Sequence, residues 1–546
     1  DNNIDFLATR SEFLTSDYDV LLATDPSEAE TILRTKHVHL AILDVRLVDD
    51  NDSADVSGLA LAQKSEFRQI PKIILTGNAT VNLVIDAMAP DKDGVAPALR
   101  FLQKDEGAAK LQQVVAEVFA DLITANWELR LRWSNGLSAL GIAALVKLND
   151  DEAQTAETAI ELEDLFRQLF ADRAQVTIWR LFSCHAGIAS LLVTTHSEQH
   201  PELHYVVMCG RKEQIVAEQQ RHVVVAPIQS DRSATFHGLE TGIWLALSAY
   251  RFPNVSFEQI ATLAGHYRTL TTETLAMVIE DLLTVNLSLW HEESHSLQSA
   301  EQACAFFSQS GGLHSTYADL DWTHQLRTLC DAVTSRGICH LQLTADTLAL
   351  ALPDDETHTF PNPMTFGPAS GQTPPYSTKV LVHYGTIHGR LGGDTILISP
   401  QVKTYLIDHA AVDVGPLLYD YVSLECAIRL VLPMKIDISQ RIQLEDLLAK
   451  CSELDDGGDI NNVDDALLKP LTAITLIRKF AATQVHSDIE QYHCALFYHL
   501  LAQLVRYDAT AYYLRHELMS FVHLLIACAQ LAKRWLQTEK ESGIPL

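Results

Sequence analysis

The chain has 546 residues, too many for one hydrophobic core, and a usual domain size of about 100–200 residues predicts three or four folded units. Its 47% hydrophobic and 20% charged residues are ordinary for globular proteins, so most of the chain is expected to fold. The net charge of −30 argues against nucleic acid and anionic membranes as main ligands, because both attract Lys- and Arg-rich surfaces.

The nine cysteines are scattered and include no Cys-x-x-Cys pair. This pattern favours buried thiols in a reducing compartment over a disulfide framework or a zinc site. The longest apolar run, Leu518–Ala532, is too short to cross a bilayer, and no signal peptide is visible. The first residue is Asp rather than Met, which indicates that the natural N-terminus is missing. These features predict a cytoplasmic protein.

In residues 1–120, short apolar runs such as "HLAILDV" and "KIILTG" alternate with segments of helical period. Apolar strands separated by helices predict a doubly wound parallel sheet that is covered on both faces. Chemistry in such sheets gathers at the carboxyl ends of the strands, where Asp44, Thr76 and Lys104 stand. A carboxylate nucleophile, a hydroxyl group and an ammonium group together favour a phosphoacceptor site.

This segment resembles the receiver domain of two-component response regulators, which has a flavodoxin-like fold. "DNNIDFL" is similar to the acidic turn after the first strand, "ILDVRL" to the phosphoacceptor strand, "ILTG" to the switch position and "FLQKDEG" to the Lys-bearing end. The resemblance implies that Asp44 is phosphorylated by a histidine kinase, that Thr76 and Lys104 contact the phosphoryl group, and that Asp1 and Asp44 hold Mg²⁺. The family's acidic pair is reduced to Asp1 beside Asn2, which leaves open a receiver that never takes phosphate.

Two acidic stretches accompany this segment. The loop "VDDNDSADVSG" after Asp44 either supplies a substitute metal carboxylate or is a solvated loop. Further on, the apolar stripe of "EGAAKLQQVVAEVFADLITANWELRLRW" predicts one long helix that packs on its own sheet or contacts a partner. "NDDEAQTAETAIELEDLF" is interpreted as an acidic surface connection that leads into a helix at "ELEDLFRQLF".

After residue 173, "AQVTIWRLFSCHAGIASLLVTT" and "LHYVVMCG" predict antiparallel strands, and "RKEQIVAEQQRHVVV" predicts a helix. Much later, "HGRLGGDTILIS" is followed by "YLIDH". Kinase-type phosphotransfer requires a loop over the phosphates, a Lys on them, a Glu that holds the Lys, an Asp base, and an Asn and Asp on Mg²⁺.

These motifs resemble the kinase-like fold of aminoglycoside- and choline-type phosphotransferases, and within that group the bacterial "ternary complex associated" kinase-like modules. The resemblance implies that Glu218 is the helix Glu and that Met208 stands at the position of the phosphate-binding Lys. The hairpin "FSCHAGIAS" keeps one glycine, Gly187, where a phosphate loop would be glycine-rich.

In the later motif His388 is retained, Arg390 stands at the position of the base and Thr395 at that of the metal-binding Asn, while Asp408 matches the second metal ligand. Arg390 cannot accept a proton, because its guanidinium stays charged in proteins. Asp394 next to the motif is an alternative base. We therefore expect no catalytic residue here, no ATP and no enzyme; the alternative is an active ATP-dependent phosphotransferase that receiver phosphorylation regulates.

Helix-period segments dominate from about residue 430, and predict an α-helical lobe of an α+β, bilobal kinase-like domain. "WHEESH" formally matches the zinc motif His-Glu-x-x-His, but 23 histidines make a chance match credible, and a helix end is the preferred interpretation. The predicted domains are residues 1–120 (receiver-like), 107–172 (linker helix and acidic connection), 173–290 (N-lobe and start of the helical lobe) and 291–546 (C-lobe with helical extension).

The sequence therefore predicts a bacterial signalling adaptor in which a receiver-like domain controls a kinase-like domain. Its expected partners are a histidine kinase or other signalling protein at the receiver-like domain and an effector protein at the kinase-like domain. A structural receiver pair that forms a homodimer is a third hypothesis.

Overall fold

The computed structural model describes residues 1–49, 52, 54–77, 79–90, 94–146, 151–185, 187–197, 201–225, 234–252, 260–293, 297–303, 306–307, 322–352, 356–367, 379–431, 436–451, 453–454, 463–484, 486–507, 509, 511 and 513–542. The chain divides into two compact units. Unit 1 is Asp1–Gln219 with Thr235–Phe252, and unit 2 is Gln220–Ala234 with Pro253–Leu546. The domain boundaries expected from the sequence stay predictions.

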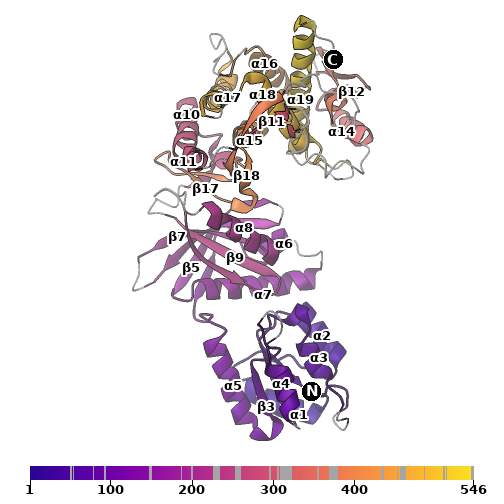
Figure 1. Ribbon diagram of the computed structural model, residues 1–546, viewed down its shortest axis with the longest axis vertical. Coiled ribbons are helices and arrows are strands. Elements are labelled where there is room, and N and C mark those ends of the chain that lie inside the picture. The colour runs from indigo at the N-terminus through magenta and orange to yellow at the C-terminus, as the bar shows by residue number, and fades with distance from the viewer. Residues whose placement is uncertain are drawn as a thin grey trace. The chain divides into compact units, whose positions relative to one another are not determined.

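The first part of unit 1 is a parallel sheet with helices on both faces (Figure 1). Its strands pair in the order β1-β2-β3, and alternate residues of β2 enter different cores: Ile74 packs with α2 and α3, whereas Ile73 and Leu75 pack with α1 and α5. The elements are α1 (Ile4–Leu14), α2 (Pro26–Thr35), β1 (Ala41–Asp44), α3 (Ser57–Ala62), η1 (Ser65–Phe67), β2 (Lys72–Thr76), α4 (Val81–Met88), β3 (Arg100–Gln103), η2 (Lys104–Glu106) and α5 (Ala108–Asp121). The parallel sheet agrees with the prediction, but three described strands do not establish a flavodoxin-like fold.

One apolar run of this region, "DVLLA", does not form a strand. Residues 19–23 have no regular secondary structure, and a cavity of about 1200 Å³ lies between them and β1. Val20 and Leu22 line it from one side, and Leu40 and Ile42 from the other. β1 is therefore an edge strand among the described residues, although its sequence is as apolar as that of a central strand.

The second part of unit 1 is a six-stranded sheet of order β4-β5-β6-β7-β9-β8, in which only the β4–β5 pair is parallel. The predicted antiparallel strands and the following helix are confirmed. The predicted long linker helix is too long, because α5 ends at Asp121 and the residues "RLRW" pair with β5. The elements are β4 (Arg130–Trp133), α6 (Ala139–Val146), α7 (Glu152–Leu169), β5 (Gln175–His185), β6 (Ile188–His196), β7 (Leu203–Arg211), α8 (Lys212–Val225), β8 (Thr235–Thr241) and β9 (Leu245–Arg251).

Helix α7 corrects the interpretation of the acidic stretch as a surface connection. The helix starts at Glu152, nine residues before the "ELEDLFRQLF" segment, and packs against β9, with Leu162 and Phe166 in the core. Glu161 is fully buried and accepts hydrogen bonds from the backbone N–H groups of Ile243, Trp244 and Leu245. Burial raises the pKa of Glu161, although the hydrogen bonds from these N–H groups act in the opposite direction. Glu161 can therefore lie in the packed interior, because the N–H groups of the β8–β9 turn replace the water molecules that would otherwise bind its carboxylate.

Unit 2 begins with short sheets and helices. Its three sheets have the orders β10-β16-β17, β11-β15-β18 and β12-β13-β14, and all their pairs are antiparallel. The elements are β10 (Ala261–Thr262), α9 (Leu263–His266), α10 (Thr272–Asp281), the π-helical turn η5 (Leu282–Leu287), α11 (Ser288–Glu293), β11 (Leu297–Gln302), α14 (Trp322–Ser335), β12 (His340–Leu343), β13 (Thr347–Ala351), β14 (Thr357–Pro361), η6 (Pro363–Phe366), β15 (Lys379–Ile387), β16 (Ile396–Ile398), β17 (Thr404–Leu406), η7 (His409–Ala411) and β18 (Asp413–Pro416).

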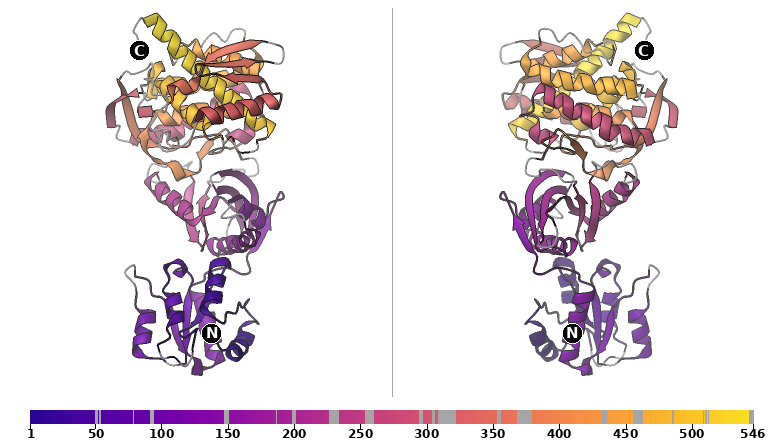
Figure 2. Two further views of the ribbon diagram at one scale, coloured as in Figure 1. Left: turned by 90° about the vertical axis from the view of Figure 1, so that its right-hand side faces the viewer. Right: turned by 90° about the vertical axis from the view of Figure 1, so that its left-hand side faces the viewer.

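The rest of unit 2 is helical, as predicted, and its helices pack side by side (Figure 2). They share one large apolar core with the sheets of the unit. The helices are α15 (Leu418–Val431), α16 (Ile438–Ala449), α17 (Asp465–Gln484), α18 (Ile489–Leu504) and α19 (Arg515–Ser542). No helix in the part of the chain that the structure describes is long and apolar enough to cross a membrane. Cys209, Cys330, Cys339, Cys426, Cys451, Cys494 and Cys528 are buried, in agreement with the expectation of buried thiols.

A buried ion cluster joins four of these helices. Glu425 of α15 is fully buried and binds Arg429 of the same helix at 2.5 Å and Arg478 of α17 at 3.0 Å. Tyr492 of α18 donates a hydrogen bond of 2.8 Å to the same carboxylate. Arg429 also pairs with Glu445 of α16. Burial alone would raise the pKa of Glu425, but the charges of Arg478 and Arg429 lower it to about 2.

Replacing Glu425 with Ala is expected to lower the free energy of unfolding by roughly 3–5 kcal/mol, because two guanidinium groups lose their buried counter-ion. In the wild type, the contribution of Glu425 is fully present above about pH 4.5 and is lost as the pH falls towards 2, since its folded-state pKa is depressed. Urea denaturation at neutral pH and at pH 3 measures both effects. Glu280→Ala, at an exposed position of α10, is the control, and equal losses in the two variants would contradict the role of the cluster.

Candidate functional site

The predicted phosphoacceptor residues come together at one edge of the parallel sheet. Asp44 is the last residue of β1, Thr76 the last of β2, and Lys104 directly follows β3. The Nζ of Lys104 lies 2.5 Å from Oδ2 of Asp44 and 2.8 Å from Oδ2 of Asp1. Asp44 is only 3% exposed. Two carboxylates from distant parts of the sequence therefore converge on one ammonium group.

This set of side chains fits the Mg²⁺ that the receiver resemblance implies. Mg²⁺ prefers carboxylate oxygens and keeps several waters, so one or two carboxylates suffice to hold it. Asp1 and Asp44 approach the same Lys104 nitrogen, which shows that their oxygens can share one cation. Asp1 and Asp44 would hold the ion, and Lys104 would stay beside it to neutralise a phosphoryl group.

Asp55, in the acidic loop after Asp44, does not act as a spare ligand in the structure. Its carboxylate accepts the backbone N–H groups of Val48 and Asp49 at 2.9 Å each, and that of Ser57 at 2.9 Å. Burial opposes its ionisation, but these donors and the Ser57 hydroxyl lower its pKa to about 2. Asp55 thus holds the loop in shape, an explanation that the sequence analysis did not weigh.

Gly58, at the start of α3, is a residue that sequence reasoning missed. A Cβ atom at this position would lie 1.7 Å from the backbone oxygen of Asp44, so only glycine lets α3 approach the phosphoacceptor strand this closely. In the sequence, only the Ser-Gly pair at the end of the acidic loop pointed to this glycine. Such a pair indicates a turn as readily as it indicates two backbone segments that approach closely.

Two of the kinase-related residues lie in unit 1. Met208 of β7 is buried, and its sulfur accepts a hydrogen bond of 3.2 Å from the Ser190 hydroxyl. Glu218 of α8 is also buried and accepts hydrogen bonds from Ser248 at 3.1 Å and from Tyr250 at 2.7 Å. Two hydroxyl groups thus contact the carboxylate, while a thioether occupies the predicted lysine position.

The other candidate residues form a compact turn in unit 2. The backbone N–H groups of His388 and Gly389 donate to the two carboxylate oxygens of Asp420, at 2.9 and 3.0 Å. Gly389 has φ of +72°, and a Cβ there would lie 2.3 Å from the oxygen of Ala411. Burial lowers the pKa of the His388 imidazole, against the opposing charge of Asp420. Asp420 lies within the first turn of α15, and its carboxylate fixes the turn at His388 and Gly389.

Arg390 and Asp408 form an ion pair across the turn. Nη1 of Arg390 lies 2.8 Å from Oδ2 of Asp408, and both side chains are largely buried. Asp408 itself has a left-handed backbone with φ of +64°. The Thr395 hydroxyl accepts from Gly392 N–H at 2.9 Å and contacts the Arg390 carbonyl at 3.2 Å, so it closes the loop between them. Arg390 thus binds directly to the carboxylate that the resemblance assigns to metal.

The zinc-like motif "WHEESH" cannot be assessed as a whole. His291 belongs to α11, and its ring lies near Tyr421, at 5.7 Å between ring centres. His295 lies outside the described residues.

No protein-family model matches the chain, and no curated protein matches it. Solved structures that match the chain include choline kinase LicA from Streptococcus pneumoniae, at 9% identity and a TM-score of 0.32, covering 62% of this chain and 89% of that one. Amicoumacin kinase hAmiN has 10% identity and a TM-score of 0.31, covering 65% and 86%. An aminoglycoside phosphotransferase from Alicyclobacillus acidocaldarius has 12% identity and a TM-score of 0.29, covering 64% and 90%.

These findings correct one expectation from the sequence. The similar structures are named as kinases and phosphotransferases, which contradicts the expectation that the chain is not an enzyme. We do not retain that expectation. The mixed sheet and the helical C-terminal part agree with a kinase-like fold. At these identities and TM-scores the comparison assigns no substrate, cofactor or partner to this chain.

The turn geometry predicts that two glycines of one loop respond differently to the same substitution. Gly389→Ala is expected to lower the free energy of unfolding by about 1–3 kcal/mol, because alanine disfavours the positive φ and its Cβ would meet the Ala411 backbone. Gly392→Ala is the matched control, since a Cβ there comes no closer than 3.9 Å to its nearest neighbour. Chemical denaturation followed by circular dichroism compares them, and an equal change in both variants would refute the described turn.

Proposed function

We propose that this chain is a signalling protein whose input is a phosphoryl group on Asp44 and whose output is the kinase-like region, residues 173–546, in contact with an effector protein. The observation that carries the proposal is the convergence of Asp44, Asp1 and Lys104 beside Thr76 at the carboxyl edge of the parallel sheet. A structural ion pair alone would not require this combination of an acidic nucleophile, a second carboxylate, a hydroxyl and an ammonium group.

The proposed step is transfer of a phosphoryl group to a carboxylate oxygen of Asp44. This oxygen attacks the phosphorus of a phosphohistidine, the new O–P bond forms as the N–P bond breaks, and the histidine nitrogen of the donor leaves with its electron pair. Mg²⁺ at Asp1 and Asp44 would supply charge neutralisation. Lys104 would pair with a phosphoryl oxygen, and the Thr76 hydroxyl would donate to another.

The partners follow from the same chemistry. The phosphodonor would be a histidine kinase or an equivalent phosphorelay protein, and the effector would be a protein rather than nucleic acid, since the net charge of −30 repels phosphate backbones. The compartment would be the cytoplasm, because the cysteines are scattered along the sequence without a Cys-x-x-Cys pair, a pattern that suits a reducing environment better than a disulfide framework. Dimerisation through the receiver-like domain is the competing output.

Incubation with acetyl phosphate and Mg²⁺ is expected to add one phosphoryl group per chain, measured by intact-protein mass spectrometry. Asp44→Asn should abolish the adduct, and Lys104→Met should slow its formation by at least about tenfold, because a cation that stabilises the transferred group is lost. Asp86→Asn, at an exposed position of α4, is the matched control. Absence of any adduct on the folded wild type, with beryllium fluoride also failing to bind, would overturn the phosphoacceptor proposal.

At the kinase-like region, Arg390 binds Asp408, the residue that the resemblance assigns to a metal ion, and Met208 offers no charge to a phosphate. Mg²⁺–ATP is therefore expected to raise the melting temperature of the wild type less than that of Arg390→Ala. In Arg390→Ala, the released Asp408 carboxylate should let Mg²⁺ raise that temperature. A saturable shift in the wild type that Asp408→Asn abolishes and Asp394→Asn retains would favour an ATP-dependent phosphotransferase that receiver phosphorylation regulates.

A further inference from the structure

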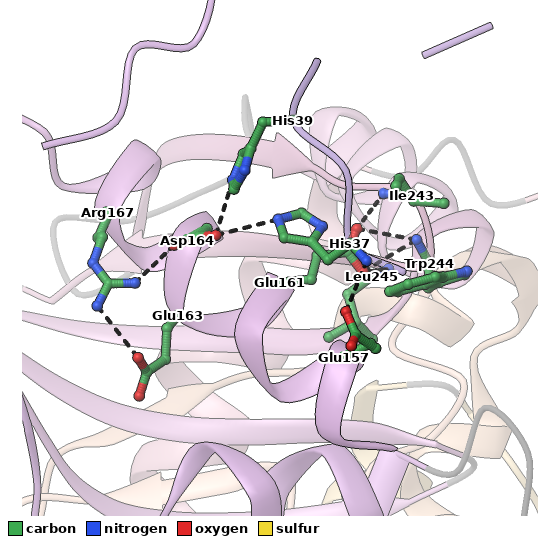
Figure 3. A network of polar contacts seen from close by, with 10 residues as sticks. All are labelled: His37, His39, Glu157, Glu161, Glu163, Asp164, Arg167, Ile243, Trp244 and Leu245. Atoms are coloured by element: carbon green, nitrogen blue, oxygen red, sulfur yellow. Dashed lines mark hydrogen bonds and ion pairs between the residues drawn. The ribbon is translucent and has the colours of Figure 1, made fainter. Parts of the chain in front are cut away.

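Two histidines of the parallel-sheet part and one aspartate of α7 point to a common place within unit 1 (Figure 3). His37 and His39 belong to the segment between α2 and β1, and Asp164 belongs to helix α7. Nε2 of His37 lies 3.2 Å, and Nε2 of His39 2.9 Å, from the same oxygen, Oδ2 of Asp164. The ligand-type atoms of all three residues lie within 4.8 Å of one another.

The two histidines flank Val38 in a segment without regular secondary structure that precedes β1 at Ala41, and Val38 packs against the core of the parallel sheet. The rings of His37 and His39 pack edge to face, with centres 4.5 Å apart. The side chain of His37 is 8% exposed, and neither of its ring nitrogens makes a hydrogen bond among the described residues, although Nε2 lies at ion-pair distance, 3.2 Å, from Oδ2 of Asp164.

Neighbouring groups hold the three side chains in place. Arg167 donates to the other oxygen of Asp164, Oδ1, at 2.7 Å, which leaves Oδ2 directed at the histidines. Glu157, earlier on the same helix, accepts the backbone N–H of His37 at 2.9 Å and so fixes the histidine segment against α7. In metal sites, residues that form hydrogen bonds to the ligand side chains hold those side chains in the orientation that the metal requires.

We propose that His37, His39 and Asp164 form a site for a divalent transition-metal ion of the Zn²⁺ type, with water as the fourth ligand. Metal–ligand distances of about 2.0 Å place neighbouring ligands of a tetrahedral ion about 3.3 Å apart. The two distances to Oδ2 of Asp164, 3.2 and 2.9 Å, are close to that spacing. Imidazole nitrogens suit zinc and its neighbours, whereas Mg²⁺ and Ca²⁺ prefer oxygen ligands, so this site is chemically distinct from the Asp1–Asp44 site.

Such an ion would tie the segment that leads into β1 and Asp44 to helix α7 of the second sheet. The polar contacts that already join them include the pair of Lys36 with Glu157 at 2.8 Å, the hydrogen bond from the His37 backbone N–H to Glu157, and the side-chain contacts of the two histidines with Asp164. The inference stands apart from the proposed function, since metal binding at these three residues requires no phosphorylation of Asp44.

The test is equilibrium dialysis of the purified full chain against Zn²⁺, followed by elemental analysis of the bound metal. The wild type is expected to hold one more equivalent of Zn²⁺ than the double variant His37→Asn, His39→Gln, and than Asp164→Asn. Each single replacement should weaken binding at least about tenfold. The amide side chains can still hydrogen-bond to their neighbours, and circular dichroism checks that the variants are folded. His196→Asn, at a surface His–Glu pair of the same unit, is the matched control and should bind as the wild type does.

Co²⁺ substitution provides an independent measurement. The wild type loaded with Co²⁺ is expected to show the intense visible absorption of a tetrahedral ion and quenched tryptophan fluorescence, because the Trp127 ring lies 5.4 Å from that of His39. Zn²⁺ should displace Co²⁺, and a large excess of Mg²⁺ should not. Equal metal content in the wild type and the double variant, or displacement by Mg²⁺, would show that these residues are not a transition-metal site and would overturn the inference.

Discussion

Unit 1 depends on the way in which α7 buries its carboxylates. A carboxylate taken out of water is costly unless charges or hydrogen-bond donors replace its hydration. Each of three acidic residues along this helix meets different donors: Glu157 meets Lys36 and the His37 backbone, Glu161 the turn amides at residues 243–245, and Asp164 the two histidines and Arg167. The position of α7 is thereby fixed from the parallel sheet and from the β8–β9 turn at once.

Helix α7 connects the second sheet to the edge of the parallel sheet at which Asp44 lies, through a few contacts along one segment. The segment that contacts α7 continues directly into β1, which ends at Asp44. Asp44 shares Lys104 with Asp1, so a phosphoryl dianion on Asp44 would compete with Asp1 for the same ammonium group. A phosphoryl charge at Asp44, if the proposed transfer occurs, would act on a strand that follows the segment held by Glu157 and Asp164.

The sequence predicted what local patterns determine. Asp44, Thr76 and Lys104 were placed together because apolar strands of parallel sheets end at one edge, and this required no knowledge of partners. The acidic face of α7 was misjudged because its donors lie far away in the sequence, at His37 and at Trp244. The sequence could not show that the apolar residues 19–23 form no strand, for a similar reason. An apolar segment becomes a strand only if the edge of a neighbouring strand lies within hydrogen-bonding distance.

The same reasoning changes the meaning of Arg390. From the sequence it is an absent base, whereas in the structure it is the counter-ion of Asp408, and each of the two charges makes burial of the other tolerable. A metal ion can reach Asp408 only if the Arg390 guanidinium moves towards solvent. About a third of the Arg390 side chain is exposed, so this movement is open to it. Metal binding at Asp408, as the resemblance implies it, would therefore depend on a competition between an internal cation, Arg390, and an external one. The relative affinities of Arg390 and of a metal ion for Asp408 decide that competition, and a comparison of sequence motifs does not give these affinities.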